Sequence, residues 1–157
     1  MLLAGTLAAQ PRSVEVFGRA GFMRMGGDES SLGTGAAYGG AVLVPITRRF
    51  AVDVDALTAR AARELGGGSL ETRRTLIHPA LVFRWGNSRI YGFAGGGIGG
   101  EFTRSGPGSS DSGRLMVAKT GIVANPTGRL LLRADFYWSA RYVLPNTGVT
   151  VGVGFRF

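Results

Sequence analysis

Apolar and polar residues alternate one by one through most of this sequence, most clearly at its end. In GVTVGVGFRF, residues 148–157, the odd-numbered positions from Val149 to Phe157 are Val or Phe, and the positions between them are Thr, Gly or Arg. A repeat of two is the period of a β-strand, whose successive side chains point to opposite faces. The alternation recurs in about eight segments from residue 13 onward, without convincing amphipathic helices. The sequence therefore predicts an all-β fold.

Composition narrows the class of protein. The chain has 157 residues, 45% of them apolar, with 27 glycines and no cysteine. One domain with a real core is expected, and disorder, a disulfide scaffold and cysteine-based metal sites are disfavoured. The net charge of +8 comes almost entirely from arginines scattered along the chain. Because nucleic-acid binding favours clustered basic residues with aromatic platforms, no nucleic-acid partner is expected.

The links between the alternating segments differ in length. Short turns are expected at residues 47–49, 86–89 and 125–128, because Gly, Asn and Pro in these segments suit tight turns. Longer polar links alternate with them: GGDESSLGTG, ARELGGGSLETRR, TRSGPGSSDSG and ARYVLPNTG. Long links at one end and short turns at the other indicate an up-and-down meander. About eight such strands close most economically into an antiparallel β-barrel, which leaves no unpaired edge.

Alternation alone does not say which face of the barrel is inside. A soluble, lipocalin-like barrel would enclose an apolar ligand, whereas a transmembrane barrel would turn its apolar face to lipid. The apolar faces carry no charge in their central stretches, which favours the transmembrane β-barrel. Aromatic residues near strand ends suit interfacial girdles; these are Phe22, Tyr38, Trp85, Tyr91 and Trp138.

The opposite, polar faces carry charges of both signs in near balance. Such balance suits a narrow interior, where buried ions need partners. We therefore expect a lumenal charge network of Glu15, Arg19, Asp53, Asp55, Arg84, Lys119, Arg133, Asp135 and Arg156.

Several segments resemble a known family. GAAYGGAVLVPITRRFAVDVDA, NPTGRLLLRADFYW and the terminal VTVGVGFRF are similar to hairpins and the C-terminal signal of small eight-stranded bacterial outer-membrane barrels, of the outer membrane protein A transmembrane-domain and opacity-protein type. The similarity of pattern covers nearly all of residues 13–157. The resemblance implies outer-membrane location and contact with outer-membrane lipid and lipopolysaccharide. It also implies assembly from the periplasm by the barrel-assembly machinery, which would read the terminal residues Val153, Phe155 and Phe157. It implies no single activity.

The chain is expected to consist of a short N-terminal segment and a single domain. Residues 1–12 include MLLAGTLAAQ, which suits a signal-peptide remnant that lacks a basic start, or an N-terminal tail. Residues 13–157 form the outer-membrane β-barrel domain. The peptidoglycan-binding domain of longer relatives is not expected, so anchoring to the wall is not supported.

Three features could indicate chemistry, and each has a structural alternative. Barrel enzymes of the lipid A deacylase type use a His and a Ser two residues apart, but His78 is followed by Pro79 and Ala80. Asp53 and Asp55 share a strand face and could hold a cation, although pairing with Arg19, Arg133 or Arg156 is favoured. GFAGGGIGG, residues 92–100, is not followed by a helix, which argues against a dinucleotide loop. No catalytic residue, metal or cofactor is therefore expected.

The resulting hypothesis is a monomeric, non-enzymatic outer-membrane barrel with a structural or surface-interaction role and no open solute channel. The alternatives are a soluble lipocalin-like carrier and a lipid-modifying barrel enzyme. Link arginines are either solvated charges or contacts for lipopolysaccharide phosphates; these are Arg60, Arg63, Arg73, Arg74, Arg104, Arg114 and Arg141.

Overall fold

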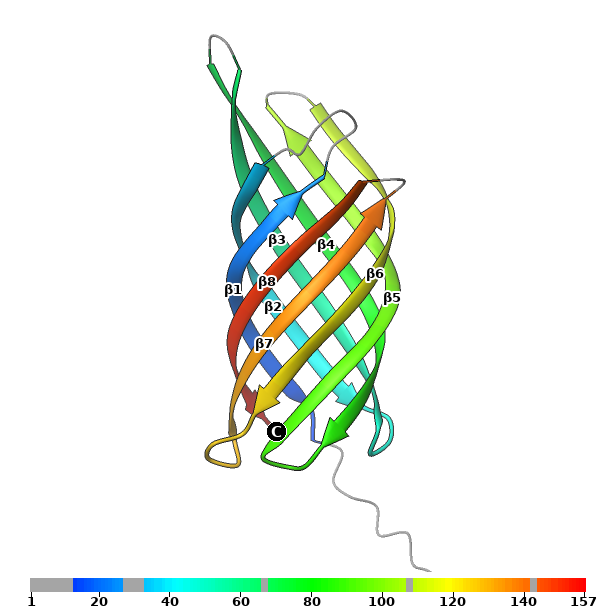
Figure 1. The fold of residues 1–157 in the computed structure, drawn as a ribbon. Coiled ribbons are helices and arrows are strands. Elements are labelled where there is room, and N and C mark those ends of the chain that lie inside the picture. Colours follow the sequence, from blue (N-terminus) through cyan, green and yellow to red (C-terminus); the bar gives the residue numbers. More distant parts are fainter. Residues whose placement is uncertain (1–12, 27–32, 66–67, 107–108, 142–143) are drawn as a thin grey trace, which may run out of the picture.

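The chain folds into a closed barrel of eight antiparallel strands. A computed structural model describes residues 13–26, 33–65, 68–106, 109–141 and 144–157, so the predicted tail at 1–12 lies outside the described residues. The strands are β1 (Glu15–Met25), β2 (Gly33–Pro45), β3 (Phe50–Leu65), β4 (Gly68–Gly86), β5 (Ile90–Ser105), β6 (Ser109–Ala124), β7 (Leu130–Arg141) and β8 (Leu144–Arg156). Each strand pairs with its neighbours in sequence, and β1 pairs with β8 (Figure 1). The predicted all-β, up-and-down closed barrel is confirmed.

Closure depends on the pairing of the first and last strands. The antiparallel β1–β8 register runs from Glu15 opposite Arg156 to Arg24 opposite Thr147. Beyond it, the Phe157 amide donates a hydrogen bond to the Val14 carbonyl oxygen at 3.0 Å. Closing the sheet in this way leaves no strand edge open to pair with another chain. None of the described residues forms a helix long and apolar enough to cross a membrane.

The three predicted short turns lie together at one end of the barrel, which we call the turn end. A side-chain oxygen organises each turn. Thr47 Oγ1 accepts a hydrogen bond from the Phe50 amide at 2.9 Å, and Asn87 Oδ1 accepts one from the Ile90 amide at 2.9 Å. Asn125 Oδ1 accepts one from the Gly128 amide at 2.8 Å. All three turns agree with the prediction.

The opposite end, which we call the far end, differs from expectation. The long polar links predicted at residues 62–74 and 103–113 are mostly strand, since β3 continues to Leu65 and β5 to Ser105. The β3–β4 hairpin rises highest at this end (Figure 1). Polar residues continue the β3–β4 strand pairing beyond the apolar part of the wall. One example is the hydrogen bond between the hydroxyls of Thr58 and Thr75, whose oxygens are 3.1 Å apart. Backbone pairing does not require apolar side chains, so composition alone placed the strand ends too early.

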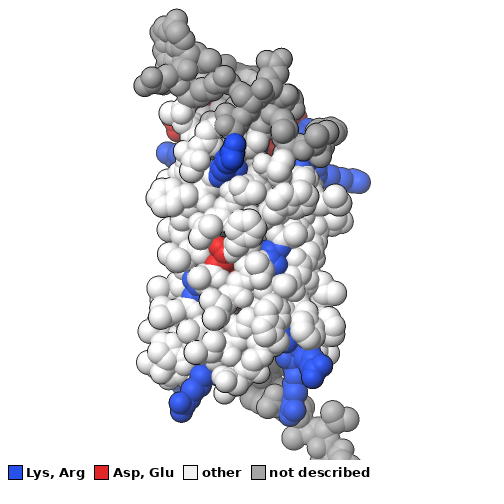
Figure 2. Space-filling view, viewed as in Figure 1, with Lys and Arg blue, Asp and Glu red and all other residues white. Residues whose placement is uncertain are grey.

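The two faces of the barrel wall are chemically inverted relative to a soluble protein. Large apolar side chains cover the outside of every strand, for example Val54, Leu81, Ile98 and Val151, all of which are exposed. Most charges within the strands' middle stretches face inward and are buried. In the view of Figure 2, the middle of the barrel is mostly white with a few charged atoms visible between other side chains, whereas Lys and Arg side chains stand out near the two ends. This pattern is typical of a barrel whose outside contacts lipid.

The wall between β4 and β5 contains a local irregularity. Register pairs run to Ile77–Gly100 and resume at Ala80–Gly97, with an interruption at His78 and Pro79. Proline has no amide hydrogen to donate to a ladder, which explains the interruption. The backbones approach closely here, because a Cβ atom added to Gly97 would overlap the Pro79 carbonyl oxygen. Glycine is therefore required at this position by space rather than by dihedral angle.

Candidate functional site

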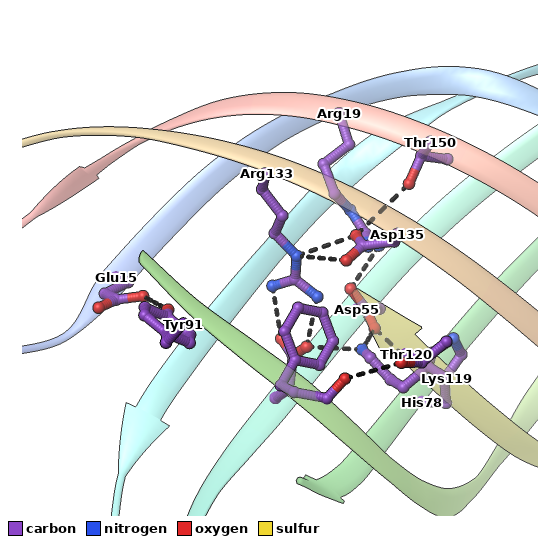
Figure 3. A network of polar contacts seen from close by, with 12 residues as sticks. Glu15, Arg19, Asp55, His78, Tyr91, Lys119, Thr120, Arg133, Asp135 and Thr150 are labelled. Carbon is purple, nitrogen blue, oxygen red and sulfur yellow. Dashed lines mark hydrogen bonds and ion pairs between the residues drawn. The ribbon is translucent and has the colours of Figure 1, made fainter. Parts of the chain in front are cut away.

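The middle of the barrel interior, or lumen, is occupied by buried ion pairs (Figure 3). Arg133 on β7 lies at their centre. Its Nη2 is 2.5 Å from Asp53 Oδ2 across the lumen, and its Nε donates to Asp135 Oδ1 on the same strand at 2.8 Å. The guanidinium also lies over the rings of Phe17 and Phe93, 5.0 and 4.7 Å from their centroids. Carboxylates and aromatic faces thus surround this cation.

Two further cations complete the group. Arg19 on β1 bonds to Asp135 Oδ2 at 2.5 Å and also pairs with Asp55. Lys119 on β6 is 2.7 Å from Asp53 Oδ2 and also pairs with Asp55. We call these residues the central ionic cluster, which comprises Arg19, Asp53, Asp55, Lys119, Arg133 and Asp135. Three carboxylates and three cations balance, so the lumen holds them without excess charge.

The two aspartates on β3 show how the cluster is organised. Asp53 pairs with Arg133, and Asp55 pairs with Arg19. Both arginines were among the three partners that the sequence predicted for these aspartates. Arg156, the third predicted partner, contacts Glu15 instead. In the described part of the chain, no group of three or more acidic or histidine side chains is arranged to hold a metal ion.

A second polar group closes the lumen near the turn end. Glu15 on β1 accepts hydrogen bonds from Tyr91 and, at 2.7 Å, from Arg156 Nη2. Arg84 lies 3.9 Å from the same carboxylate and stacks over the Tyr91 ring at 4.2 Å. The remaining members of the predicted charge network therefore also face the interior, although Arg84 and Arg156 are only partly buried.

The placement of Tyr91 in the lipid-facing aromatic girdle is wrong. Its side chain is 4% exposed and points into the lumen, toward Glu15. The sequence around it offers little contrast between the two strand faces, because Gly92 and Ala94 follow an exposed Ile90. Its hydroxyl finds a buried carboxylate partner, which offsets the cost of removing it from water. Phe22, Tyr38 and Trp85 are exposed on the outside, and Trp138 is half-buried there.

A third polar group lies in the lumen toward the far end, and the sequence did not predict it. Arg74 Nη1 donates to Asn146 Oδ1 at 2.5 Å, and Asn146 Nδ2 donates to Glu101 Oε2 at 3.1 Å. Arg74 was expected among the link arginines that could reach lipopolysaccharide, but its side chain is 7% exposed and faces the lumen. The alternation of the strand could have revealed this position. Arg74 lies two and four residues before the inward-facing Leu76 and His78, so it is on the same face of β4.

Apolar clusters separate the polar groups along the lumen. One, nearer the turn end, contains Phe17, Ala41, Leu43, Ala51, Ala80, Val82, Tyr91, Phe93, Val123 and Leu131. The other, nearer the far end, contains Met23, Met25, Ala37, Leu57, Ala59, Ala61, Leu76, Leu115, Val117 and Tyr137. Side chains therefore pack the interior, as in other barrels of about eight strands.

His78 is the one histidine of the sequence and points into the lumen. It is 1% exposed, and its Nδ1 lies 3.6 Å from Asp55 Oδ2. Among the described residues, neither of its ring nitrogens has a hydrogen-bond partner, so no hydroxyl is placed for activation. A His–Ser pair of the kind that a lipid-modifying barrel enzyme uses is not formed by this side chain.

Several arginine side chains lie on the outer surface of the barrel toward the far end. We call these exposed, outward-facing residues the arginine ring: Arg24, Arg60, Arg73, Arg104 and Arg114. Arg141 is different, because its Nη1 donates to Asp111 Oδ2 at 2.6 Å. These hydrogen bonds lower the pKa of the exposed Asp111 carboxyl below its ordinary value. The side chain of Arg63 lies outside the described ones.

Comparison with solved structures identifies the fold. No protein-family model matches the sequence, and no curated protein is significantly similar to it. Neisserial surface protein A superposes with a TM-score of 0.77 at 13% identity, covering 92% of this chain and 97% of that one. Ail, the attachment invasion locus protein of Yersinia pestis, gives 0.63 at 18% identity, with 93% and 98% covered. The N-terminal β-barrel domain of Pseudomonas aeruginosa OprF gives 0.62 at 14% identity, with 93% and 98% covered.

These neighbours are small eight-stranded outer-membrane barrels, and this chain has their fold. The resemblance inferred from the alternating hairpins is therefore confirmed at the level of architecture.

Proposed function

We propose that this protein is an integral protein of the bacterial outer membrane that contributes to the envelope or to surface interactions and catalyses no reaction. The inversion of its two faces carries the proposal. The apolar outside suits lipid, and six paired ionic side chains fill the middle of the lumen. A soluble carrier would need the reverse arrangement, with an apolar interior for its ligand.

The interior supports a barrel without an open solute channel. Polar groups at three levels are bonded across the lumen, and two apolar clusters pack among them. Permeation would require several buried ion pairs to separate at once, which is costly in a low-dielectric interior. In planar lipid bilayers we expect no steady single-channel steps. Regular unitary currents from the purified protein would contradict this part of the proposal.

The arginine ring supports lipopolysaccharide as the lipid partner. With the turn end in the periplasm, the ring would lie near the outer leaflet, where lipopolysaccharide carries phosphate groups. Guanidinium groups form paired hydrogen bonds with phosphate oxygens, and each basic residue near an anionic surface contributes about 1 kcal/mol. A monomer is sufficient for this function, because closure satisfies every strand edge within one chain.

The last residues support recognition by the barrel-assembly machinery. Val153, Phe155 and Phe157 all have exposed, outward side chains, so they are accessible on the outside of the barrel. Pairing of β8 with β1 would follow recognition. We expect Phe157→Ala to slow insertion in cells while leaving the stability of the folded barrel nearly unchanged. Normal insertion kinetics for this variant would argue against a signal at this residue.

Membrane fractionation tests the whole proposal. The protein should fractionate with the outer membrane, require detergent for extraction and show a heat-dependent shift in gel mobility. A folded protein that remains in aqueous solution without detergent would overturn the proposal. To test the non-enzymatic part, lipid A would be incubated with folded protein. Release of acyl chains that is lost in His78→Ala would contradict it.

A further inference from the structure

A groove runs along the outside of β8, between β1 and β7, toward the far end of the barrel. Its volume is about 300 Å³, and its lining residues are Phe22, Arg24, Thr34, Phe136, Thr147, Gly148 and Val149. All of these residues except Gly148 lie on the outward face of their strands. The groove is therefore part of the surface that the proposed function assigns to lipid.

The apolar part of the groove has two aromatic walls and a narrow floor. Val149 pairs in register with Phe22 on β1 and with Phe136 on β7. The two phenylalanines therefore flank a smaller side chain on the same face. Exposed fractions of 67% for Phe22, 55% for Val149 and 48% for Phe136 show that all three are open to an occupant. A single extended hydrocarbon chain fits between two such rings, whereas a protein segment would bring unpaired backbone groups into lipid.

The end of the groove nearer the far end is polar. Arg24 follows Phe22 by two residues on the same face, and its register partners are Thr34 on β2 and Thr147 on β8. No described residue forms a hydrogen bond or an ion pair with the Arg24 guanidinium. An exposed cation flanked by two threonines, next to the apolar part of the groove, complements a lipid with an anionic headgroup and an acyl chain.

We propose that this groove binds one acyl chain of a phosphorylated outer-leaflet glycolipid of the lipid A type, with Arg24 on a headgroup phosphate. The inference rests on the proposed outer-membrane location, and it deepens the general contact of the arginine ring with lipopolysaccharide. It adds a defined site with a chain between Phe22 and Phe136. The phosphate and the acyl chain belong to one molecule, so both ends of the groove must contribute to its retention.

The test uses the full chain folded into lipid nanodiscs that contain bis-phosphorylated, hexa-acylated lipid A among zwitterionic phospholipid. After extraction into mild detergent, native mass spectrometry measures the fraction of protein that retains lipid A. Val149→Phe fills the floor without changing charge, and Arg24→Gln removes the cation without changing the floor. The matched controls are Val151→Phe, on the same outward face of β8 but outside the groove lining, and Arg48→Gln, an exposed arginine in a turn at the opposite end of the barrel.

We expect Arg24→Gln to lower retention about fivefold, the loss that corresponds to one basic contact near an anionic surface. Val149→Phe should lower retention at least as much, because its ring occupies the space of the acyl chain. The two controls should retain lipid A as the wild type does, and lipid A lacking phosphate should be retained weakly by all variants. Equal retention by Val149→Phe and wild type would overturn the groove, as would preferential retention of the zwitterionic phospholipid. An equal loss in Arg48→Gln would also overturn it.

The heat-dependent gel shift separates this proposal from the broader one. Suppose that every variant inserts and shows the normal heat-dependent gel shift, but the groove variants retain lipid A fully. The outer-membrane function then stands and the groove assignment fails. If the wild-type protein does not insert at all, the proposed function itself fails.

Discussion

Removal of the central cation should be the most damaging conservative change inside the barrel. Arg133→Gln deletes a buried charge that is paired with Asp53 at 2.5 Å and with Asp135 at 2.8 Å. Those carboxylates keep Lys119 and Arg19 as partners, but the central ionic cluster then has three acids against two cations. Breaking a buried ion pair by removing one partner costs about 3–5 kcal/mol. The unfolding equilibrium should therefore shift by roughly 150- to 5,000-fold.

Restoring the balance gives a sharper measurement than the single change. In the double variant Arg133→Gln, Asp53→Asn, two acids and two cations remain, and Arg19 and Lys119 still pair with Asp55. The double variant should therefore be more stable than the single one, although it has lost more charges. Arg48→Gln, an exposed charge in a turn, should change the free energy of unfolding by less than about 0.5 kcal/mol.

Urea unfolding in lipid vesicles, followed by tryptophan fluorescence, measures all three variants. Trp85 and Trp138 lie on the outside of the barrel, so their emission reports transfer from lipid to water. Two results would refute the reasoning. One is a loss in the free energy of unfolding for Arg133→Gln that is no larger than the loss for Arg48→Gln. The other is a double variant that is less stable than Arg133→Gln alone.

Three further changes test other parts of the structure. Val151→Arg places a charge on the lipid-facing side of β8 and should lower the free energy of unfolding by about 2–4 kcal/mol in the same urea experiment; no loss would mean that this face does not contact lipid. Gly97→Ala should reduce the yield of heat-shifted, folded protein, because the new Cβ overlaps the Pro79 carbonyl, whereas Gly18→Ala, with open space around its Cβ position, should not. Equal yields would contradict the close approach. Tyr91→Phe removes a buried hydrogen bond and should cost about 1 kcal/mol in urea unfolding; unchanged stability would count against a lumenal Tyr91.

The sequence assigns residues to the inner or outer face of the barrel only where alternating positions of a strand differ clearly in chemistry. On β7, Leu132 and Phe136 alternate with Arg133 and Asp135, so the two faces differ strongly and the sequence assigns them correctly. On β5, the outward positions after Ile90 are Gly92 and Ala94, and no charge marks the inward face near Tyr91. The tyrosine could be read either as a girdle residue or as an interior one. Only its contact with Glu15 on another strand decides the matter.

The sequence by itself determined the architecture: strands from the two-residue period, closure from the number of strands and their short turns, and an inverted barrel from uncharged apolar faces. These are local properties that each segment carries independently. The tertiary structure decided which ions meet. Arg133 and Asp53 are 80 residues apart and become partners only when closure brings β3 and β7 across one lumen. It also placed Phe22 beside Val149 and Phe136, because the β1–β8 register arises only in the closed barrel.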